Sequence, residues 1–221
     1  MNPQAFEAIL AALDLFSVVV FAVTGALVAS RKEMDVFGFS LLGTVTGVGG
    51  GSLRDVLLGQ TPVFWVKEPV YILLCVAASV VVFFTAHIPA SRYRVLIWLD
   101  SVGLSLVAVL GAERGLDAGT GPTVAIVMGV ISATFGGIIR DILGAESPIV
   151  LRKEIYVTAA LMGAAIYVAA VALGADKLIA TIVGFTACFV VRALAIIYRW
   201  SLPPYKSRRG RGPDELDRLN L

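Results

Sequence analysis

The amino-acid sequence predicts an all-α integral membrane protein with seven transmembrane helices, arranged as two inverted three-helix repeats plus a seventh helix. Three observations lead to this fold class: the composition, the length of the apolar stretches and an internal duplication. Of the 221 residues, 58% are hydrophobic and only 15% are charged, and the mean hydropathy is +0.88. Soluble domains carry about 25% charged residues, so the composition places the chain in the membrane class.

Seven stretches reach about the 20 apolar residues that a helix needs to cross the hydrocarbon core of a bilayer. They are 8–29, 36–58, 69–88, 95–111, 122–143, 155–173 and 178–198. The first stretch is not preceded by basic residues, since the early charges are Glu7 and Asp14 and the first basic residue is Arg31. A signal peptide begins with basic residues, so we expect the first helix to be retained.

The sequence does not indicate an enzyme. Cys75 and Cys188 lie well inside apolar stretches at no metal-ligand spacing, and we interpret both as packing residues. His87, the only histidine, ends the third stretch and is best interpreted as an interfacial residue. We therefore expect no catalytic residues, no cofactor, no bound metal and no nucleic-acid partner.

Basic residues are distributed unequally between the two ends of the predicted helices. If the stretches alternate in direction, twelve of the 18 Lys and Arg residues fall on one side and three on the other. The positive-inside rule assigns the richer side to the cytoplasm. We thus predict a cell (inner) membrane protein with its N-terminus outside and a basic, partly disordered cytoplasmic tail at 199–221. The tail could attract anionic lipid, although a plain topology signal is the simpler explanation.

The chain repeats itself at an ungapped shift of 86 residues. This shift superimposes acidic and basic residues, glycines and prolines, all of which are scarce in apolar helices, so it indicates a duplication. The matched pairs include Asp14 with Asp100, Arg54 with Arg140, Asp55 with Asp141, Gly25 with Gly111, Gly43 with Gly129, Gly50 with Gly136, Gly51 with Gly137 and Pro62 with Pro148.

Each copy contains three helices, so the second copy must enter the membrane from the opposite face. We therefore predict an inverted-topology repeat. The first copy spans 8–88, the second spans 94–174, and the seventh helix, 178–198, lies outside both.

Both copies carry consecutive glycines near the middle of their second helix, GGG at 49–51 and GG at 136–137. Matched interruptions in two halves are the best sequence indication of a transport site. Each glycine weakens a helix by about 1 kcal/mol relative to alanine, so we predict that helices two and five break there and face a cavity. The alternative is close helix packing at small residues.

An Arg-Asp pair follows each glycine run at the same spacing. Charge inside a membrane is costly and usually faces a partner or a pathway. We expect Asp14 and Arg54 to share a level near the outer face, and Asp100 and Arg140 to share one near the cytoplasmic face. These pairs are either structural clamps between helices or part of a polar path, and both interpretations can hold.

The acids that follow the arginines, Asp55 and Asp141, lie about 100° further around the helix and would face the path. Hydroxyl groups near the glycines either replace water around an ion or bond back to helix carbonyls. The predicted ion-path residues are Thr46, Gly49, Gly50, Gly51, Ser52, Arg54, Asp55, Ser132, Thr134, Gly136, Gly137, Arg140 and Asp141, and the predicted clamps are Asp14 and Asp100.

The remaining intramembrane and boundary charges are interpreted as interfacial. Arg192, near the cytoplasmic end of the seventh helix, is expected to snorkel to the interface. Lys67 and Glu68 are expected to anchor the start of helix three, where the helix dipole favours an acidic residue.

The doubled motif, GGGSLRD at 49–55 and FGGIIRD at 135–141, resembles the prokaryotic trimeric intracellular cation (TRIC) channel family, also called the glycine transporter domain family. The resemblance extends over 8–198. It implies a homotrimer whose protomers each hold a pore, lined by helices two and five and permeable to potassium and some sodium. It also suggests membrane phospholipid as a partner. Phe135 replaces the third glycine in the second copy, so the two helices need not bend equally.

We therefore predict a passive monovalent cation channel in which Asp55 and Asp141 attract cations while Arg54 and Arg140 set the pore geometry. Two alternatives stay open. The same broken helices would suit a secondary transporter of glycine or another small amino acid. A structural membrane scaffold would use the charges only as clamps.

Overall fold

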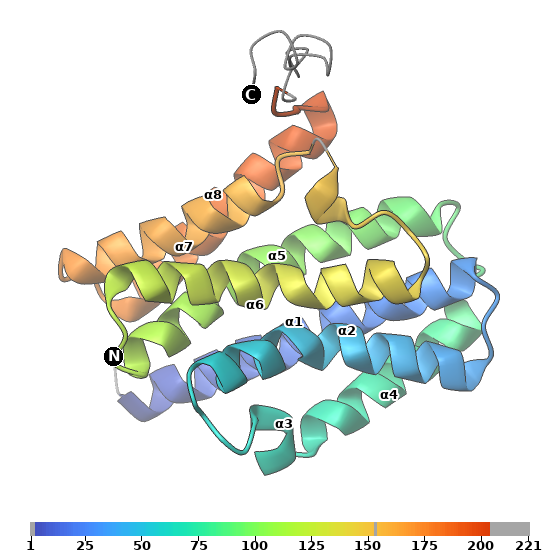
Figure 1. Cartoon of the computed structure of the whole chain (residues 1–221), viewed down its shortest axis with the longest axis horizontal. Coiled ribbons are helices and arrows are strands. Elements are labelled where there is room, and N and C mark those ends of the chain that lie inside the picture. Colours follow the sequence, from blue (N-terminus) through green and yellow to red (C-terminus); the bar gives the residue numbers. More distant parts are fainter. Residues whose placement is uncertain (1–2, 153, 204–221) are drawn as a thin grey trace, which may run out of the picture.

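A computed structural model describes residues 3–152 and 154–203, which fold into a bundle of α-helices (Figure 1). In chain order the elements are α1 (Pro3–Arg31), α2 (Val36–Leu57), α3 (Phe64–Lys67), α4 (Val70–Thr85), α5 (Arg92–Asp117), α6 (Pro122–Leu143), the 3-10 helix η1 (Ile149–Leu151), α7 (Val157–Ala172) and α8 (Lys177–Tyr198). Each predicted apolar stretch falls on one of the longer helices. Residues 204–221 of the predicted tail lie outside the described residues.

Five of the described helices are long and apolar enough to cross a membrane: α1 from Ala8, α2, α5, α6 and α8. Helices α4 and α7 are also apolar, but each has only 16 residues. At about 1.5 Å per residue they span about 24 Å, slightly less than the hydrocarbon core. The structure supports an all-helical membrane fold, and a total of seven spanning helices stays a prediction.

Local sequence signals explain where the helices begin and end. The Asp35 carboxylate accepts a hydrogen bond of 2.8 Å from the N–H of Gly38 and so caps the start of α2. Pro122 occupies the first turn of α6, where its missing N–H costs nothing. After α2 and α7, Gly59 and Gly174 adopt the left-handed conformation, with φ of 67° and 84°. Glycine suits this conformation because it lacks a Cβ.

The helices form two groups with matching contacts. Helix α4 packs against α1 and α2, while α7 packs against α5 and α6. The groups meet where α1 packs against α5 and α2 packs against α6, and α8 is added on α5 and α7. Figure 1 shows α2 and α6 side by side across the middle of the molecule. This arrangement places the two glycine runs together at the centre.

The second and fifth predicted stretches correspond to α2 and α6. The breaks predicted in them are absent, because both continue as helices through their glycines. The glycines instead allow close contact: a Cβ at Gly50 would overlap the carbonyl oxygen of Ser132, and one at Gly136 would overlap that of Thr46. Contacts between the helices offset the low helix propensity of glycine. Close packing, the alternative considered for the glycines, therefore describes them correctly.

Candidate functional site

The first Arg-Asp pair lies in the last turns of α2. The Nε and Nη2 atoms of Arg54 donate hydrogen bonds of 2.9 and 2.7 Å to Oδ1 of Asp55. The second carboxylate oxygen of Asp55 accepts a bond of 2.9 Å from the backbone N–H of Phe64, the first residue of α3. Asp55 therefore neutralises its own neighbour and holds the following loop.

Asp14 is near this pair but has a different partner. Among the described residues, Asp14 and Arg54 do not form the predicted ion pair. The hydroxyl of Tyr71, on α4, donates a hydrogen bond of 2.9 Å to Oδ2 of Asp14. We refer to Asp14, Arg54, Asp55, Phe64 and Tyr71 as the first site.

The second pair, at the end of α6, is more extensively bonded. Nη1 of Arg140 lies 2.7 Å from Oδ1 of Asp100 and 3.0 Å from the hydroxyl oxygen of Thr24, on α1. Its Nε donates a bond of 2.9 Å to Oδ1 of Asp141, whose other oxygen accepts a bond of 2.8 Å from the N–H of Ile149. The structure thus brings Asp100 and Arg140 together as the predicted clamp. We refer to Thr24, Asp100, Arg140, Asp141 and Tyr156 as the second site.

Tyr156 completes the second site next to Gly137. A Cβ added to Gly137 would lie 3.3 Å from the Tyr156 hydroxyl and 3.5 Å from Nη2 of Arg140. Both atoms are buried and have no hydrogen-bond partner among the described protein atoms. Buried polar groups of this kind usually bind an ordered water, so the surroundings of Gly137 are polar.

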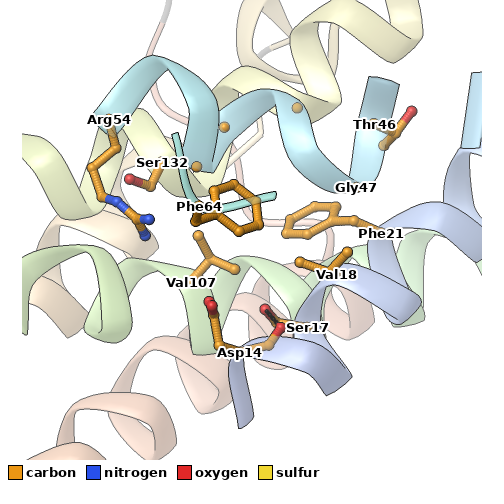
Figure 2. A pocket seen from close by; sticks show the side chains of 13 residues that line it. Asp14, Ser17, Val18, Phe21, Thr46, Gly47, Arg54, Phe64, Val107 and Ser132 are labelled. Atoms are coloured by element: carbon orange, nitrogen blue, oxygen red, sulfur yellow. Dashed lines mark hydrogen bonds between the residues drawn. The ribbon is translucent and has the colours of Figure 1, made fainter. Parts of the chain in front are cut away.

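Two cavities border the first site. The internal cavity has a volume of about 20 Å³ and is lined by residues of α1, α2, α3, α5 and α6 (Figure 2). This volume is sufficient for about one water molecule. The surface cavity has a volume of about 140 Å³ and is bordered by the exposed side chains of Lys67, Glu68 and Arg114.

The predicted path residues divide between these cavities and the packing around them. The internal cavity is lined by Thr46, Gly50, Gly51, Arg54, Ser132 and Gly136 and by the predicted clamp Asp14. Asp55 borders only the surface cavity. Gly49, Ser52, Thr134, Gly137, Arg140, Asp141 and Asp100 border neither of the two.

The hydroxyl groups have two different roles. Thr134 bonds back to the carbonyl of Val130 at 2.8 Å, and Ser52 bonds back to that of Val48 at 2.7 Å. Ser132 is only 2% exposed, and its Oγ has no hydrogen-bond partner among the described protein atoms. Because Ser132 lines the internal cavity, its hydroxyl is available to a water or an ion there.

Sequence reasoning missed several residues of these sites. Tyr71 and Tyr156 correspond at a shift of 85 residues, because the loop before Tyr156 is one residue shorter than the loop before Tyr71. An ungapped shift of 86 therefore hides this match. Phe21 and Val107 do match at 86, and both line the internal cavity. This match is present in the sequence, but matches between apolar residues are too common in such helices to indicate a site.

The expectation that Arg192 snorkels to the interface is wrong. Its side chain is buried, and its Nη2 atom lies 2.8 Å from Oε2 of Glu154 while Nη1 donates a 3.1 Å bond to the carbonyl of Ile155. Glu154 therefore provides a partner that ties α8 to the segment before α7. Lys67 does not start a long helix but ends the short helix α3.

Basic residues expected on one side of the membrane do gather at one end of the bundle. The guanidinium of Arg31 and that of Arg152 lie 5.0 and 5.9 Å from the ring centroid of Tyr93. Arg92 donates a 3.1 Å hydrogen bond to the carbonyl of Ser30, at the same end of α1. Lys67 and Arg114, expected on the opposite side, meet at the surface cavity instead.

Comparison with known proteins places the chain in a family. A family model described as "Glycine transporter" matches residues 11–87 and again residues 97–172, which together make up most of the chain. The chain belongs to this family. The inner membrane protein YadS of Escherichia coli (strain K12), of the UPF0126 group, is 37% identical over 195 residues, which cover 87% of this chain and 94% of YadS.

Solved structures connect the glycine transporter family with its other name, TRIC. A TRIC trimeric intracellular cation channel orthologue from Rhodobacter sphaeroides is 60% identical, with a TM-score of 0.85, and the match covers 87% of this chain and 99% of that one. A prokaryotic TRIC channel solved in 0.5 M KCl is 35% identical, with a TM-score of 0.82, over 89% of this chain and 100% of that one. The family indicated by the doubled motif is therefore confirmed. These relatives are described as membrane proteins and channels, and the chain is a membrane protein with transmembrane helices.

Proposed function

We propose that this protein is a passive monovalent cation channel, permeable to potassium and sodium, with an ion path in each protomer of a homotrimer. The observation that carries the proposal is the internal cavity beside the contact between α2 and α6. Its lining includes an acidic side chain, Asp14, and Ser132, whose hydroxyl has no hydrogen-bond partner in the described part of the chain. Its relatives of known structure, described as TRIC cation channels, support permeation by cations.

Charge balance favours cations in the internal cavity. Asp14 and Arg54 are the ionisable residues in its lining, and Asp55 already neutralises Arg54. The carboxylate of Asp14 is left in excess. The surface cavity is lined by three acidic and three basic residues, so it does not select by sign. Selection between cations and anions therefore belongs to Asp14 and not, as the sequence suggested, to Asp55.

The path we propose starts at the surface cavity, passes Asp14 and Arg54, and enters the internal cavity beside the contact between α2 and α6. Beyond it lies the second site, where the bonds of Arg140 close the path in this conformation. The N-terminus lies outside the cell, the basic end of the bundle lies in the cytoplasm, and phospholipid surrounds the trimer. The two copies of the duplication, 8–88 and 94–174, are inverted repeats, and with α8 they provide seven spanning helices.

The test is potassium flux from liposomes that contain the purified protein, compared between the parent protein and the Asp14→Asn variant. At an effective dielectric constant of about 20, a carboxylate about 8 Å from a passing cation attracts it by about 2 kcal/mol. We therefore expect the variant to reduce potassium flux by about thirtyfold. Asparagine can still accept the hydrogen bond from Tyr71, so the fold is retained.

Asp35→Asn is the matched control, because Asp35 is exposed, caps α2 at its other end and borders neither cavity. Its flux should equal that of the parent. Equal potassium flux for Asp14→Asn and the parent would show that Asp14 is not part of the ion path. Saturable uptake of glycine without a potassium leak would contradict the channel proposal and support a glycine transporter.

A further inference from the structure

Three side chains border both the surface cavity and the internal cavity: Asp14, Arg54 and Phe64. The two charged residues can bind water or an ion through polar atoms, whereas the ring of Phe64 has no hydrogen-bonding atom. Figure 2 shows this ring in the middle of the lining residues, with Arg54 on one side and Phe21 on the other. The partition between the two cavities is therefore largely one aromatic ring.

The ring is in contact on several sides. A Cβ on Gly51 would lie only 2.7 Å from Cε1 of Phe64, so the ring packs directly on the glycine backbone of α2. Tyr71 packs against it edge to face, with ring centroids 4.7 Å apart and an interplanar angle of 86°. The guanidinium of Arg54 lies 5.9 Å from its centroid. Gly51 is thus required for the position of Phe64 and not for a bend in the helix.

The short helix that carries Phe64 is fastened to α2 by two side chains. Oδ2 of Asp55 accepts the 2.9 Å hydrogen bond from the N–H of Phe64, and Oγ of Ser52 accepts one of 2.8 Å from the indole N–H of Trp65. Both acceptors lie in the last turns of α2. A movement of this end of α2 would therefore carry the ring with it.

We infer that Phe64 is the barrier residue of the ion path: its ring separates the surface cavity from the internal cavity and limits conductance. This inference rests on the proposed function. The role is particular to the first site. At the matching position of the second site, Gly137 faces the hydroxyl of Tyr156 and the guanidinium of Arg140, where Gly51 faces the apolar ring of Phe64. The Arg-Asp motif at the first site thus positions an apolar barrier.

The experiment measures both access to the internal cavity and flux. Cys75 and Cys188 are free and buried, so they are replaced by alanine, and Ser132→Cys provides a thiol in the internal cavity. A small cationic methanethiosulfonate reagent is added to proteoliposomes from the side of the surface cavity. We expect Phe64→Ala to raise the rate of thiol modification at least tenfold and to raise potassium flux severalfold.

Phe84→Ala is the control, because Phe84 lies on α4 and is 67% exposed, away from both cavities. It should leave both rates unchanged. Phe64→Leu keeps apolar contact with Gly51 and should give intermediate rates, which covers the case that the alanine variant does not fold. An unchanged modification rate in a folded Phe64 variant overturns the barrier. A raised rate without potassium flux in any variant keeps the barrier and overturns the channel.

Discussion

Arg54 and Arg140 occupy matching positions in the duplication, and each binds the aspartate that follows it, yet their surroundings differ. Arg54 borders two cavities and has no other ion-pair partner among the described residues, whereas Arg140 is 0% exposed and also binds Asp100 and Thr24. Arg54 is itself only 4% exposed, so the same motif forms a buried pair beside two cavities in one copy and a more extensively bonded polar cluster in the other. A duplicated sequence does not require duplicated roles.

Small sequence differences explain this divergence. The residue that matches Thr24 at the shift of 86 is Leu110, which has no acceptor to offer Arg54. Asp14 bonds Tyr71 instead of its arginine, so no carboxylate draws Arg54 away from the cavities. The first site therefore lacks the two contacts that hold Arg140.

The largest difference between the sites should appear in stability when each arginine is removed. Arg140→Ala leaves Asp100 and Asp141 buried without their partner, and breaking a buried pair costs about 3–5 kcal/mol. Arg54→Ala should cost only about 1–2 kcal/mol, because it deprives one carboxylate of its partner instead of two, and Asp55 keeps its hydrogen bond from the N–H of Phe64. The free energy of unfolding in detergent micelles measures both. Equal losses would mean that the two sites are equally closed.

The contact between α2 and α6, which both sites share, should be nearly as sensitive. Gly50→Ala pushes a methyl group into the carbonyl oxygen of Ser132, and overpacking of this kind costs about 1–3 kcal/mol. Gly49→Ala is the matched control, because its methyl group would meet the flexible end of Ile139 at 3.3 Å and the Cα of Gly136 at an ordinary contact distance of 3.8 Å. Its thermal midpoint should change little. A larger loss for Gly49→Ala would contradict the proposed register of the contact.

A smaller effect should follow from removing the hydroxyl that only the second site has. Thr24→Val deletes an acceptor of the charged Arg140, and hydrogen bonds to charged groups contribute about 1.5–3 kcal/mol. We expect a loss near the lower limit, since Asp100 remains. Thr24→Ser should keep the parent stability in the same assay. If valine and serine behave alike, the hydroxyl does not hold Arg140.

The smallest effect should come from Tyr71→Phe at the first site. This change removes the 2.9 Å bond to Asp14 but keeps the ring against Phe64. Asp14 is only half-buried and borders both cavities, so water can replace the hydroxyl and the expected loss is below about 1 kcal/mol. Potassium flux should change by less than twofold. A large loss of flux would show that Asp14 needs Tyr71 to hold its position.

The sequence predicted the helices, the duplication and the family because these depend on long patterns of hydropathy and on rare residues at fixed spacing. It also placed Asp100 with Arg140, since charge inside a membrane needs a partner. It failed at the glycines, because a run of glycines favours a break and a close contact equally until the opposing helix is known. It did not show that Asp55 and Asp141 bind the preceding arginines, because an arginine side chain is long enough to fold back on the next residue, and their place on the ion path stays a prediction. Phe64 carried no signal, since an aromatic residue in a loop gives no indication of what it separates.

The reciprocal contact of α2 with α6 has a mechanical consequence. The two antiparallel helices touch through their backbones at Gly50 and Gly136. This contact is the point about which one helix could rotate against the other. Rotation about this point that spreads the Arg54 end of α2 from its neighbours must also shift the opposite end of α2, beside the segment that holds Arg140. A rigid-body rotation of α2 would in this way move both sites together, without any side chain that runs between them.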